Sequence, residues 1–251
     1  PADTLRARTA YYALVYRLDC LIGEVLETLA REGLADDTLV VYTTDHGDQL
    51  GERGLWWKHT LFEDSVRVPV ILRWPKQLPA GERRPQVANL IDVAATMLDA
   101  LDAPPLPHAS GRSLLGVARD VRTAWVDETY AEHCTDTVPA WTGGRAIQQR
   151  MVRVGAHKLI YHHGDAPMLF DLASDPDERH DLAGDPAHVT TRDALLARVL
   201  DGWDRDAIAA RIAARREDKN VIDAWARHVH PADLYRWPLA PELNRLDPVT
   251  P

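Results

Sequence analysis

Two apolar runs rich in β-branched residues constrain this chain more than any other feature. Residues 38–43 read TLVVYT, and residues 68–74 read VPVILRW. A strand that is apolar on both faces is typical of a sheet covered on both sides, as parallel sheets are. Apolar residues at helical spacing precede the first run over residues 4–32 and follow the second over residues 90–101. This order of helix, strand, strand and helix predicts an α/β fold.

The pattern changes after about residue 120. Short strand-like runs follow one another, and the dipeptides Gly155-Ala156 and Gly164-Asp165 stand where hairpin connections are expected. The runs are AWVDET, QRMVRVG, HKLIYH and MLFDL. They predict a small antiparallel sheet. A helix is expected next, over roughly residues 188–217, because apolar residues recur there at helical spacing.

These patterns predict three parts. Residues 1–120 form part of an α/β domain, and residues 121–220 form the small antiparallel sheet with its helix. Residues 221–251 are rich in proline and aromatic residues towards their end, which favours an extended C-terminal arm over a free tail. We expect this arm to dock on its own domain or on a second copy of the chain, giving a homo-oligomer.

Composition excludes several classes of partner. Acidic residues number 38 and basic residues 29, for a net charge of −9, so the chain has no basic excess for binding nucleic acid. No apolar run approaches the roughly 20 residues that cross a membrane. The two cysteines, Cys20 and Cys134, form no CxxC pair, which favours a cytoplasmic protein. The chain begins without Met and enters a helical pattern almost at once, which we interpret as part of a longer protein.

The loop after the first apolar run carries the chemistry. Asp45 and His46 follow the run directly, and Gly47 and Gly51 allow the backbone to curve so that a carboxylate and an imidazole reach one cation. Carboxylate favours calcium, magnesium or manganese, and imidazole shifts the preference towards manganese, zinc or iron. Lys58 is suited to an anionic oxygen of a substrate. The alternative is an ordinary polar surface loop.

The longer string around this loop resembles the sulfatase family of the alkaline-phosphatase superfamily. Residues 43–75 read TTDHGDQLGERGLWWKHTLFEDSVRVPVILRWP, which is similar to that family's loop of DHG, LG, GLW, Lys and RVP. The segment NLIDVAATMLDALDAPPLP with GRSLL resembles a second family segment, although Ala95 stands where proline is usual. The stretch MLFDLASDPDERHDLA resembles the family's closing segment.

This resemblance implies a fold and a site. The fold is the C-terminal part of an alkaline-phosphatase-like mixed sheet sandwiched by helices, with a smaller antiparallel sheet and a helix. Asp45 and His46 match metal ligands, for calcium or manganese with zinc possible, and Lys58 matches the lysine that contacts the sulfate oxygen. His59 is a candidate catalytic residue on the side of the leaving group. The Asp-His pair and the GLWWK spacing resemble choline sulfatases and phosphonate monoester hydrolases.

One departure from the family weakens the prediction of activity. The C-x-[PA]-x-R motif, whose cysteine or serine becomes the formylglycine nucleophile, is absent, and neither Cys20 nor Cys134 has that context. We therefore expect a hydrolase of small sulfate esters only when a missing N-terminal part supplies the nucleophile, and an inactive chain by itself. The alternatives are a phosphonate monoester hydrolase or phosphodiesterase of the same superfamily, and a non-catalytic assembly module.

Other residues have two possible interpretations each. Arg67 is expected to anchor the loop through an ion pair, and Trp56 and Trp57 are expected to pack rather than to form walls of a substrate pocket. Glu128 and His133 could border such a pocket. The remaining histidine pairs are interpreted as turn or surface residues: His162-His163 and His228 with His230.

Overall fold

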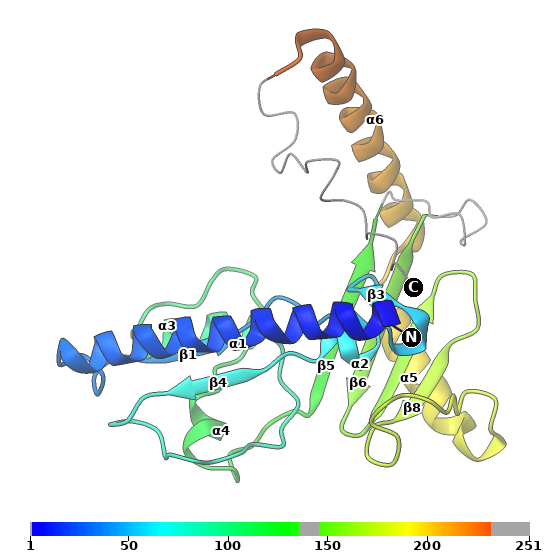
Figure 1. Ribbon diagram of the computed structural model, residues 1–251. Helices are drawn as coiled ribbons and strands as arrows, with labels where there is room; N and C mark the ends of the chain where they lie inside the picture. Colours follow the sequence, from blue (N-terminus) through cyan, green and yellow to red (C-terminus); the bar gives the residue numbers. More distant parts are fainter. Residues whose placement is uncertain (1, 136–145, 232–251) are drawn as a thin grey trace. The chain divides into compact units, whose positions relative to one another are not determined.

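The computed structural model describes residues 2–135 and 146–231 of the chain (Figure 1). These residues belong to two compact units, and each is described by itself. The first unit runs to residue 134 and continues from 147 to 203, and the second includes residues 204–231. Among the helices of the described part of the chain, none is long and apolar enough to cross a membrane.

The first unit begins with α1 (Ala2–Arg31), the helix that the apolar spacing predicts. The two apolar runs form β1 (Val40–Thr43) and β4 (Val70–Arg73), which pair with each other antiparallel in a two-stranded sheet. The expectation of parallel neighbours is therefore wrong for this pair. An apolar run carries no information about the direction of the neighbouring strand.

One face of the β1–β4 pair is covered by α3 (Leu90–Ala100) and α4 (Leu115–Arg119). The buried residues Val93, Leu114 and Val117 pack there against side chains of both strands. α3 begins at a capping box, because the side chain of Asn89 and that of Asp92 each accept a backbone N–H of the first turn. Two backbone N–H groups at this end of the helix therefore have side-chain acceptors.

The second sheet contains β5 (Glu128–Cys134), β6 (Gln148–Val154), β7 (His157–His162) and β8 (Met168–Asp171), all antiparallel in this order. The predicted antiparallel sheet is therefore present. Its first strand begins four residues later than the run AWVDET suggests, because Trp125 serves another purpose. Its ring stacks under the Arg112 guanidinium at 4.0 Å, and its Nε1 donates to the Val87 carbonyl at 2.8 Å.

Alternation along these strands creates two buried faces. Val152, Leu159 and Leu169 point to one face, where α5 (Val189–Leu200) packs with Leu195 and Val199. The neighbouring residues Met151, Ile160 and Phe170 point to the other face. On that second face they meet Leu61 and Phe62, which lie in the loop between β1 and β4. The sheet therefore packs directly against the loop between β1 and β4.

The helix predicted over roughly 188–217 is two helices. α5 ends at Leu200, and α6 (Arg205–Val229) begins after Asp204, whose side chain accepts two backbone N–H groups as an N-cap. Between them Gly202 has φ 62°, a left-handed conformation that interrupts a helix. The arm predicted from residue 221 is helical as far as Val229, and its residues 232–251 lie outside the described part of the chain.

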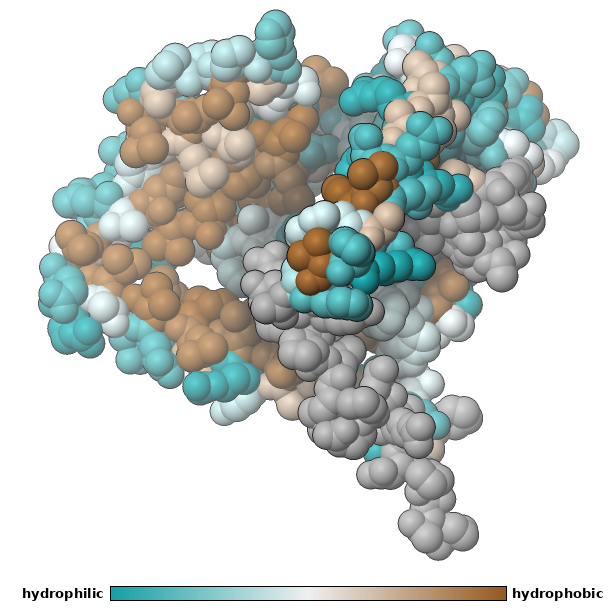
Figure 2. Space-filling model, turned by 90° about the horizontal axis from the view of Figure 1, so that it is seen from above, coloured by the Kyte–Doolittle hydropathy of each residue, from teal (hydrophilic) through white to brown (hydrophobic). Residues whose placement is uncertain are grey.

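An apolar surface extends over the part of the first unit that contains α1 and the β1–β4 pair. None of the residues of α1 is buried, and Leu14 and Tyr16 are 70% and 73% exposed. Ile71 on β4 is 56% exposed, on the face opposite to α3. Figure 2 shows hydrophobic residues gathered over this region. Large exposed apolar surfaces are typical of sites that pack against further polypeptide.

Candidate functional site

The loop between β1 and β4, residues 44–69, is called the site loop. It contains the short pair β2 (Gln49–Leu50) and β3 (Trp56–Trp57), the turn η1 (Glu52–Gly54) and the one-turn helix α2 (Glu63–Val66). Its two ends meet at Gly47, whose N–H donates to the Ser65 carbonyl at 2.8 Å. A Cβ at position 47 would stand 2.1 Å from the Asp64 carbonyl oxygen, so only glycine permits this contact.

One hydrogen bond settles the tautomer of His46. Its Nδ1 lies 2.8 Å from the Gly47 carbonyl oxygen, which can only accept, so Nδ1 carries the proton. Nε2 is therefore unprotonated and carries a lone pair. It lies 2.6 Å from the Lys58 ammonium and 3.4 Å from the Asp45 carboxylate. His46 Nε2 thus stands between a carboxylate and an ammonium group, and its lone pair faces the cation of Lys58.

The surroundings of Asp45 favour its ionised form. Desolvation raises its pKa, but the neighbouring His46, a backbone N–H, the Thr44 hydroxyl and the Lys58 charge act in the other direction. Together they lower the pKa of Asp45 below its ordinary value. The carboxylate accepts from the His46 N–H at 3.1 Å and from the Thr44 hydroxyl at 3.3 Å. It is therefore oriented as well as charged.

Asp45 and His46 together could provide two ligands to a divalent cation. Metal-bound histidines commonly donate their second ring N–H to a carbonyl, as His46 does. Two donors do not complete a coordination shell. Among residues 2–135 and 146–231, no group of three or more His, Cys, Asp or Glu residues could hold a metal ion. The residues fit one side of a metal site.

A cavity of about 910 Å³ brings the predicted site residues together. Asp45, His46, Lys58 and His59 all line it. Its walls come from the site loop, from the segment before α3 and from β5 and β6. The four residues predicted to share one site therefore line one cavity.

A buried ionic network holds the site loop on the second sheet. Lys158 of β7 is completely buried, and its Nζ lies 2.9 Å from Glu63 Oε1 and 2.8 Å from Glu178 Oε1. The Glu63 N–H donates to Glu178 Oε2 at 2.6 Å. Glu63 belongs to α2 of the site loop, so the network ties this loop to a strand that follows it by 95 positions in sequence.

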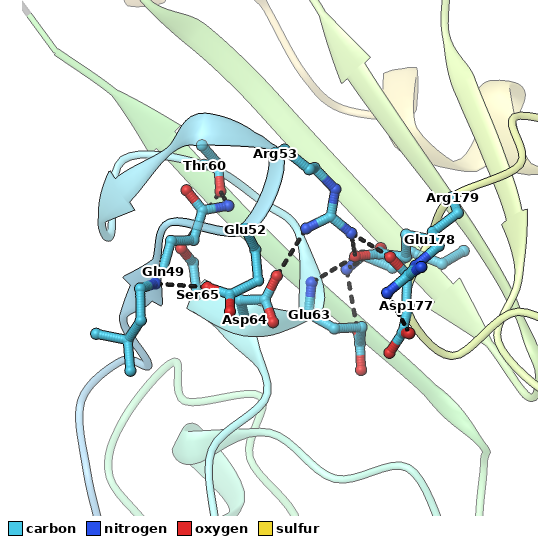
Figure 3. A network of polar contacts seen from close by, with 12 residues as sticks. Gln49, Glu52, Arg53, Thr60, Glu63, Asp64, Ser65, Asp177, Glu178 and Arg179 are labelled. Carbon is cyan, nitrogen blue, oxygen red and sulfur yellow. Dashed lines mark hydrogen bonds and ion pairs between the residues drawn. The ribbon is translucent and has the colours of Figure 1, made fainter. Parts of the chain in front are cut away.

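Arg53 extends the network along the outer side of the loop. Its guanidinium lies between Asp64, at 2.6 Å, and the segment of Asp177 and Glu178 (Figure 3). It donates to the Asp177 carbonyl and lies 3.7 Å from Glu178 Oε2. The guanidinium also stacks on the Phe62 ring at 4.2 Å. One arginine of the loop therefore joins two acidic segments far apart in sequence.

Two interpretations from the sequence differ from the structure. Arg67 is exposed and lines the cavity, and among the described residues its side chain forms no ion pair, so the expected anchor is wrong. Trp56 and Trp57 are 41% and 70% exposed and are not among the residues that line the cavity. They therefore fit neither the packed nor the pocket-wall interpretation within the described chain.

The remaining candidates are placed as follows. His133 lines the cavity, whereas Glu128 is held by Arg198 and by the Tyr130 hydroxyl away from it. Cys20 and Cys134 are free thiols. Desolvation and the Glu132 charge raise the pKa of Cys134 to about 11, so it is no nucleophile at neutral pH.

Sequence reasoning missed Gln149 and Lys158. Gln149 is 1% exposed, and its Nε2 contacts both the His59 carbonyl and His133. Gln149 stands between Gln148 and Arg150, and Lys158 stands between His157 and Leu159, so neither has a local pattern that marks it as buried. Gln149 in QQRMV and Lys158 in HKLIY became informative only when the strand register was known.

Comparison with known proteins identifies the region that contains the site loop. The family named Sulfatase matches residues 2–103. Choline-sulfatase of Rhizobium meliloti (strain 1021) is 35% identical over 224 residues, which are 86% of this chain and 41% of that protein. Arylsulfatase K of Rattus norvegicus is 32% identical over 204 residues, 77% of this chain and 35% of that protein.

A solved structure resembles the chain as well. The phosphonate monoester hydrolase SpPMH from Silicibacter pomeroyi has a TM-score of 0.67 and 30% sequence identity over 78% of this chain and 40% of that one. The mixed α/β fold with its second antiparallel sheet is therefore that of the alkaline-phosphatase superfamily, as expected. The chain spans about two-fifths of the length of these relatives.

Proposed function

Since this chain belongs to the sulfatase family, we propose that the protein is a metal-dependent hydrolase of sulfate esters. The observation that supports this most is the convergence of the His46 lone pair, the Asp45 carboxylate and the Lys58 ammonium at one cavity. Metal, anion and substrate would meet there.

Asp45 and His46 would hold the divalent metal ion, calcium or manganese with zinc as an alternative, together with ligands from outside the described residues. When bound, such an ion polarises a sulfate oxygen and stabilises an anionic nucleophile. The hydrogen bond from His46 to the Gly47 carbonyl leaves the Nε2 lone pair available, and this lone pair would bind the ion.

Lys58 would place its ammonium against a sulfate oxygen and stabilise the charge that develops there during transfer. Its contact with His46 at 2.6 Å supports this role, because Lys58 then reaches the side chain that would hold the metal. His59, or a histidine outside this chain, would supply the proton to the leaving oxygen, because it lines the cavity next to Lys58.

The nucleophile would be a formylglycine contributed by residues outside these 251, because the chain contains no C-x-[PA]-x-R motif. By this proposal the chain alone is inactive. The C-terminal residues from 221 onwards would contribute to homo-oligomerisation, as their proline-rich and aromatic composition suggests.

A substrate panel on the intact protein tests the proposal. We expect the protein carrying formylglycine to hydrolyse 4-nitrophenyl sulfate, choline sulfate or a sugar sulfate, and to lose this activity on treatment with a chelator. Restoration by calcium, manganese or zinc added singly identifies the metal. Asp45→Asn should reduce metal content measured by elemental analysis, whereas Asp120→Asn, at an exposed ion pair distant from the site loop in sequence, should not.

A second function is favoured by one observation, the similarity to the phosphonate monoester hydrolase. Sulfate and phosphonate esters present similar tetrahedral anions to a metal and a lysine. Cleavage of phosphonate monoesters with no cleavage of any sulfate ester would replace the proposed reaction by this one. Failure of the intact protein to cleave either class would favour a non-catalytic assembly module.

A further inference from the structure

His133 and Gln149 belong to the site through the register of two neighbouring strands. They are direct partners across β5 and β6, so their side chains point to the same face of the sheet. The same register pairs Ala131 with Met151, and both of these pack against Leu61 of the site loop. The face that carries His133 and Gln149 is therefore the face on which the site loop rests.

Gln149 contacts both histidines through one nitrogen. Its Nε2 lies 3.1 Å from the His59 carbonyl oxygen and 2.8 Å from His133 Nδ1. The carbonyl can only accept, so the amide must present its NH₂ group at this position. The second proton of this group then points at His133. Gln149 is 1% exposed, so water does not compete for either contact.

These contacts determine the protonation of the His133 ring. Nδ1 accepts from Gln149, so in the neutral ring the proton lies on Nε2. The ring stacks on that of His59, with centroids 5.8 Å apart and planes at 29°. Desolvation and the proximity of His59 lower the pKa of His133, which favours the neutral ring. Nε2–H has no protein partner among the described residues, and His133 lines the cavity.

The charges around His133 indicate what this donor would meet. Arg67 lines the same cavity without an ion pair in the described chain. Glu132 is the neighbouring carboxylate, but it lies 3.7 Å from the Arg150 guanidinium and accepts from the Cys134 thiol. The groups that line the cavity together with Lys58 thus include a cation, Arg67, and an N–H donor, His133. They suit a partner that offers hydrogen-bond acceptors.

We propose that His133 is a substrate-binding residue whose Nε2–H donates to an oxygen on the organic part of the ester, and that Gln149 is the positioning residue that sets its tautomer. The assignment rests on the proposed sulfatase function. It specifies the substrate class as a sulfate ester rich in hydroxyl or carboxylate oxygens, such as a sugar sulfate. A quaternary ammonium ester offers no acceptor on its cationic group.

Kinetics on the intact protein test the substrate class. His133→Phe keeps an aromatic ring against His59 and removes both ring nitrogens. We expect kcat/KM for glucose 6-sulfate to fall roughly three- to tenfold more than kcat/KM for choline sulfate, the size expected for one neutral hydrogen bond. The loss should lie in KM, because the bond is made in both ground state and transition state. His133→Gln, which retains an N–H donor, should recover part of it.

His188→Phe is the matched control, because the His188 ring lies near that of His157, with centroids 6.5 Å apart and planes tilted at 52°, and does not line the cavity. It should leave the ratio between the two substrates unchanged. An equal effect of His133→Phe on both substrates, or a larger effect on choline sulfate, would overturn the substrate class. A wild-type protein that cleaves no sulfate ester would overturn the proposed function, and the substrate assignment with it.

Nitrogen NMR of selectively labelled protein tests the tautomer independently of activity. In the wild type we expect a protonated Nε2 and an unprotonated Nδ1 at His133. Gln149→Glu replaces the donor by a carboxylate, so Nδ1 should become the protonated nitrogen, and the preference for glucose 6-sulfate should fall as in His133→Phe. A wild-type ring protonated at Nδ1 would refute the role of Gln149.

Discussion

At the scale of single residues, a backbone carbonyl has a large effect on what the site can bind. Because the Gly47 carbonyl accepts from His46 Nδ1, the opposite nitrogen is free for a cation. The reverse tautomer would direct an N–H at Lys58, and two like groups would then face each other. A metal site, an anion site or both can therefore be built on the orientation of one imidazole.

Lys58 gives the sharpest residue-level prediction. Lys58→Ala should reduce kcat/KM of the intact protein by roughly 10²–10³, the range for removal of one group that stabilises developing negative charge. Lys58→Arg retains the charge with a different shape and should lose less. Steady-state kinetics on the sulfate ester that the wild type cleaves provides the measurement, and near-normal rates for Lys58→Ala would remove this residue from the site.

We predict that His162 makes the free energy of unfolding depend on pH. Burial lowers its pKa, with Asp165 acting in the opposite direction, so the unfolded chain binds this proton more readily than the folded one. The contribution is fully present above the unfolded pKa of about 6.5 and is lost as the pH falls below it, by at most about 1.4 kcal/mol per pH unit. Urea unfolding between pH 7.5 and 5 should show a shallower decline in His162→Gln than in the wild type.

The sequence was sufficient for some residues of the site and insufficient for others. Asp45, His46 and Lys58 lie on one continuous loop, and a short loop brings its members together whatever the rest of the chain does. His133 and Gln149 meet only through strand register, and no local pattern predicts which residues face each other across β5 and β6. The ion pair expected for Arg67 failed for the same reason, because partners distant in sequence have no local signal.

At the scale of elements, the direction of strand pairing was the main feature that pattern reasoning misjudged. β1 and β4 have the composition of strands in a parallel sheet but pair antiparallel. α3 and α4 cover one face of the pair, whereas the apolar Ile71 on the other face is exposed. The hairpin signals at Gly155 and Gly164 were reliable because the turn residues adopt positive φ, of 55° and 90°, which the sequence specifies locally.

The buried network between α2 and β7 leads to a stability prediction. Lys158→Met removes the shortest ion pairs of two largely buried carboxylates, Glu63 and Glu178. It leaves them only the longer contacts to Arg153, at 3.5 Å, and to Arg53, at 3.7 Å. We expect a loss of about 3–5 kcal/mol in the free energy of unfolding, the range for breaking a buried ion pair from one side. Urea denaturation followed by circular dichroism measures it.

Arg122→Met is the control for this prediction. Arg122 also forms an ion pair, at 2.8 Å with Asp120, but its side chain is 85% exposed. Exposed pairs contribute about 0–1 kcal/mol, so this variant should unfold close to the wild type. Equal destabilisation by the two substitutions would mean that burial does not control the contribution of the Lys158 network.

At the scale of the whole molecule, the exposed apolar surface of α1 is the dominant feature of the first unit. Leu14 is 70% exposed and Leu18 is 47% exposed, one helical turn further along. We predict that the 251-residue chain self-associates through this surface, and that Leu14→Glu with Leu18→Glu reduces both the mass measured by light scattering and the binding of an apolar dye.

Two added charges elsewhere on α1 test whether the apolar surface causes the self-association. Ala10→Glu with Ala13→Glu adds equal charge to exposed positions of α1 and removes no large apolar side chain. A similar drop in mass with this pair would show that net charge controls association, and the apolar surface would then not be responsible.

The anchoring of the site loop on the second sheet has a consequence for how damage to this protein would be recognised. Leu61 and Glu63 contact strands β6 and β7, so the sheet supports the site loop and contributes few reactive groups to the site. Heat, or a core substitution that loosens those strands, would therefore abolish activity although every reactive side chain remained unchanged. Loss of turnover would then serve as an early report of unfolding in the strands that support the site loop.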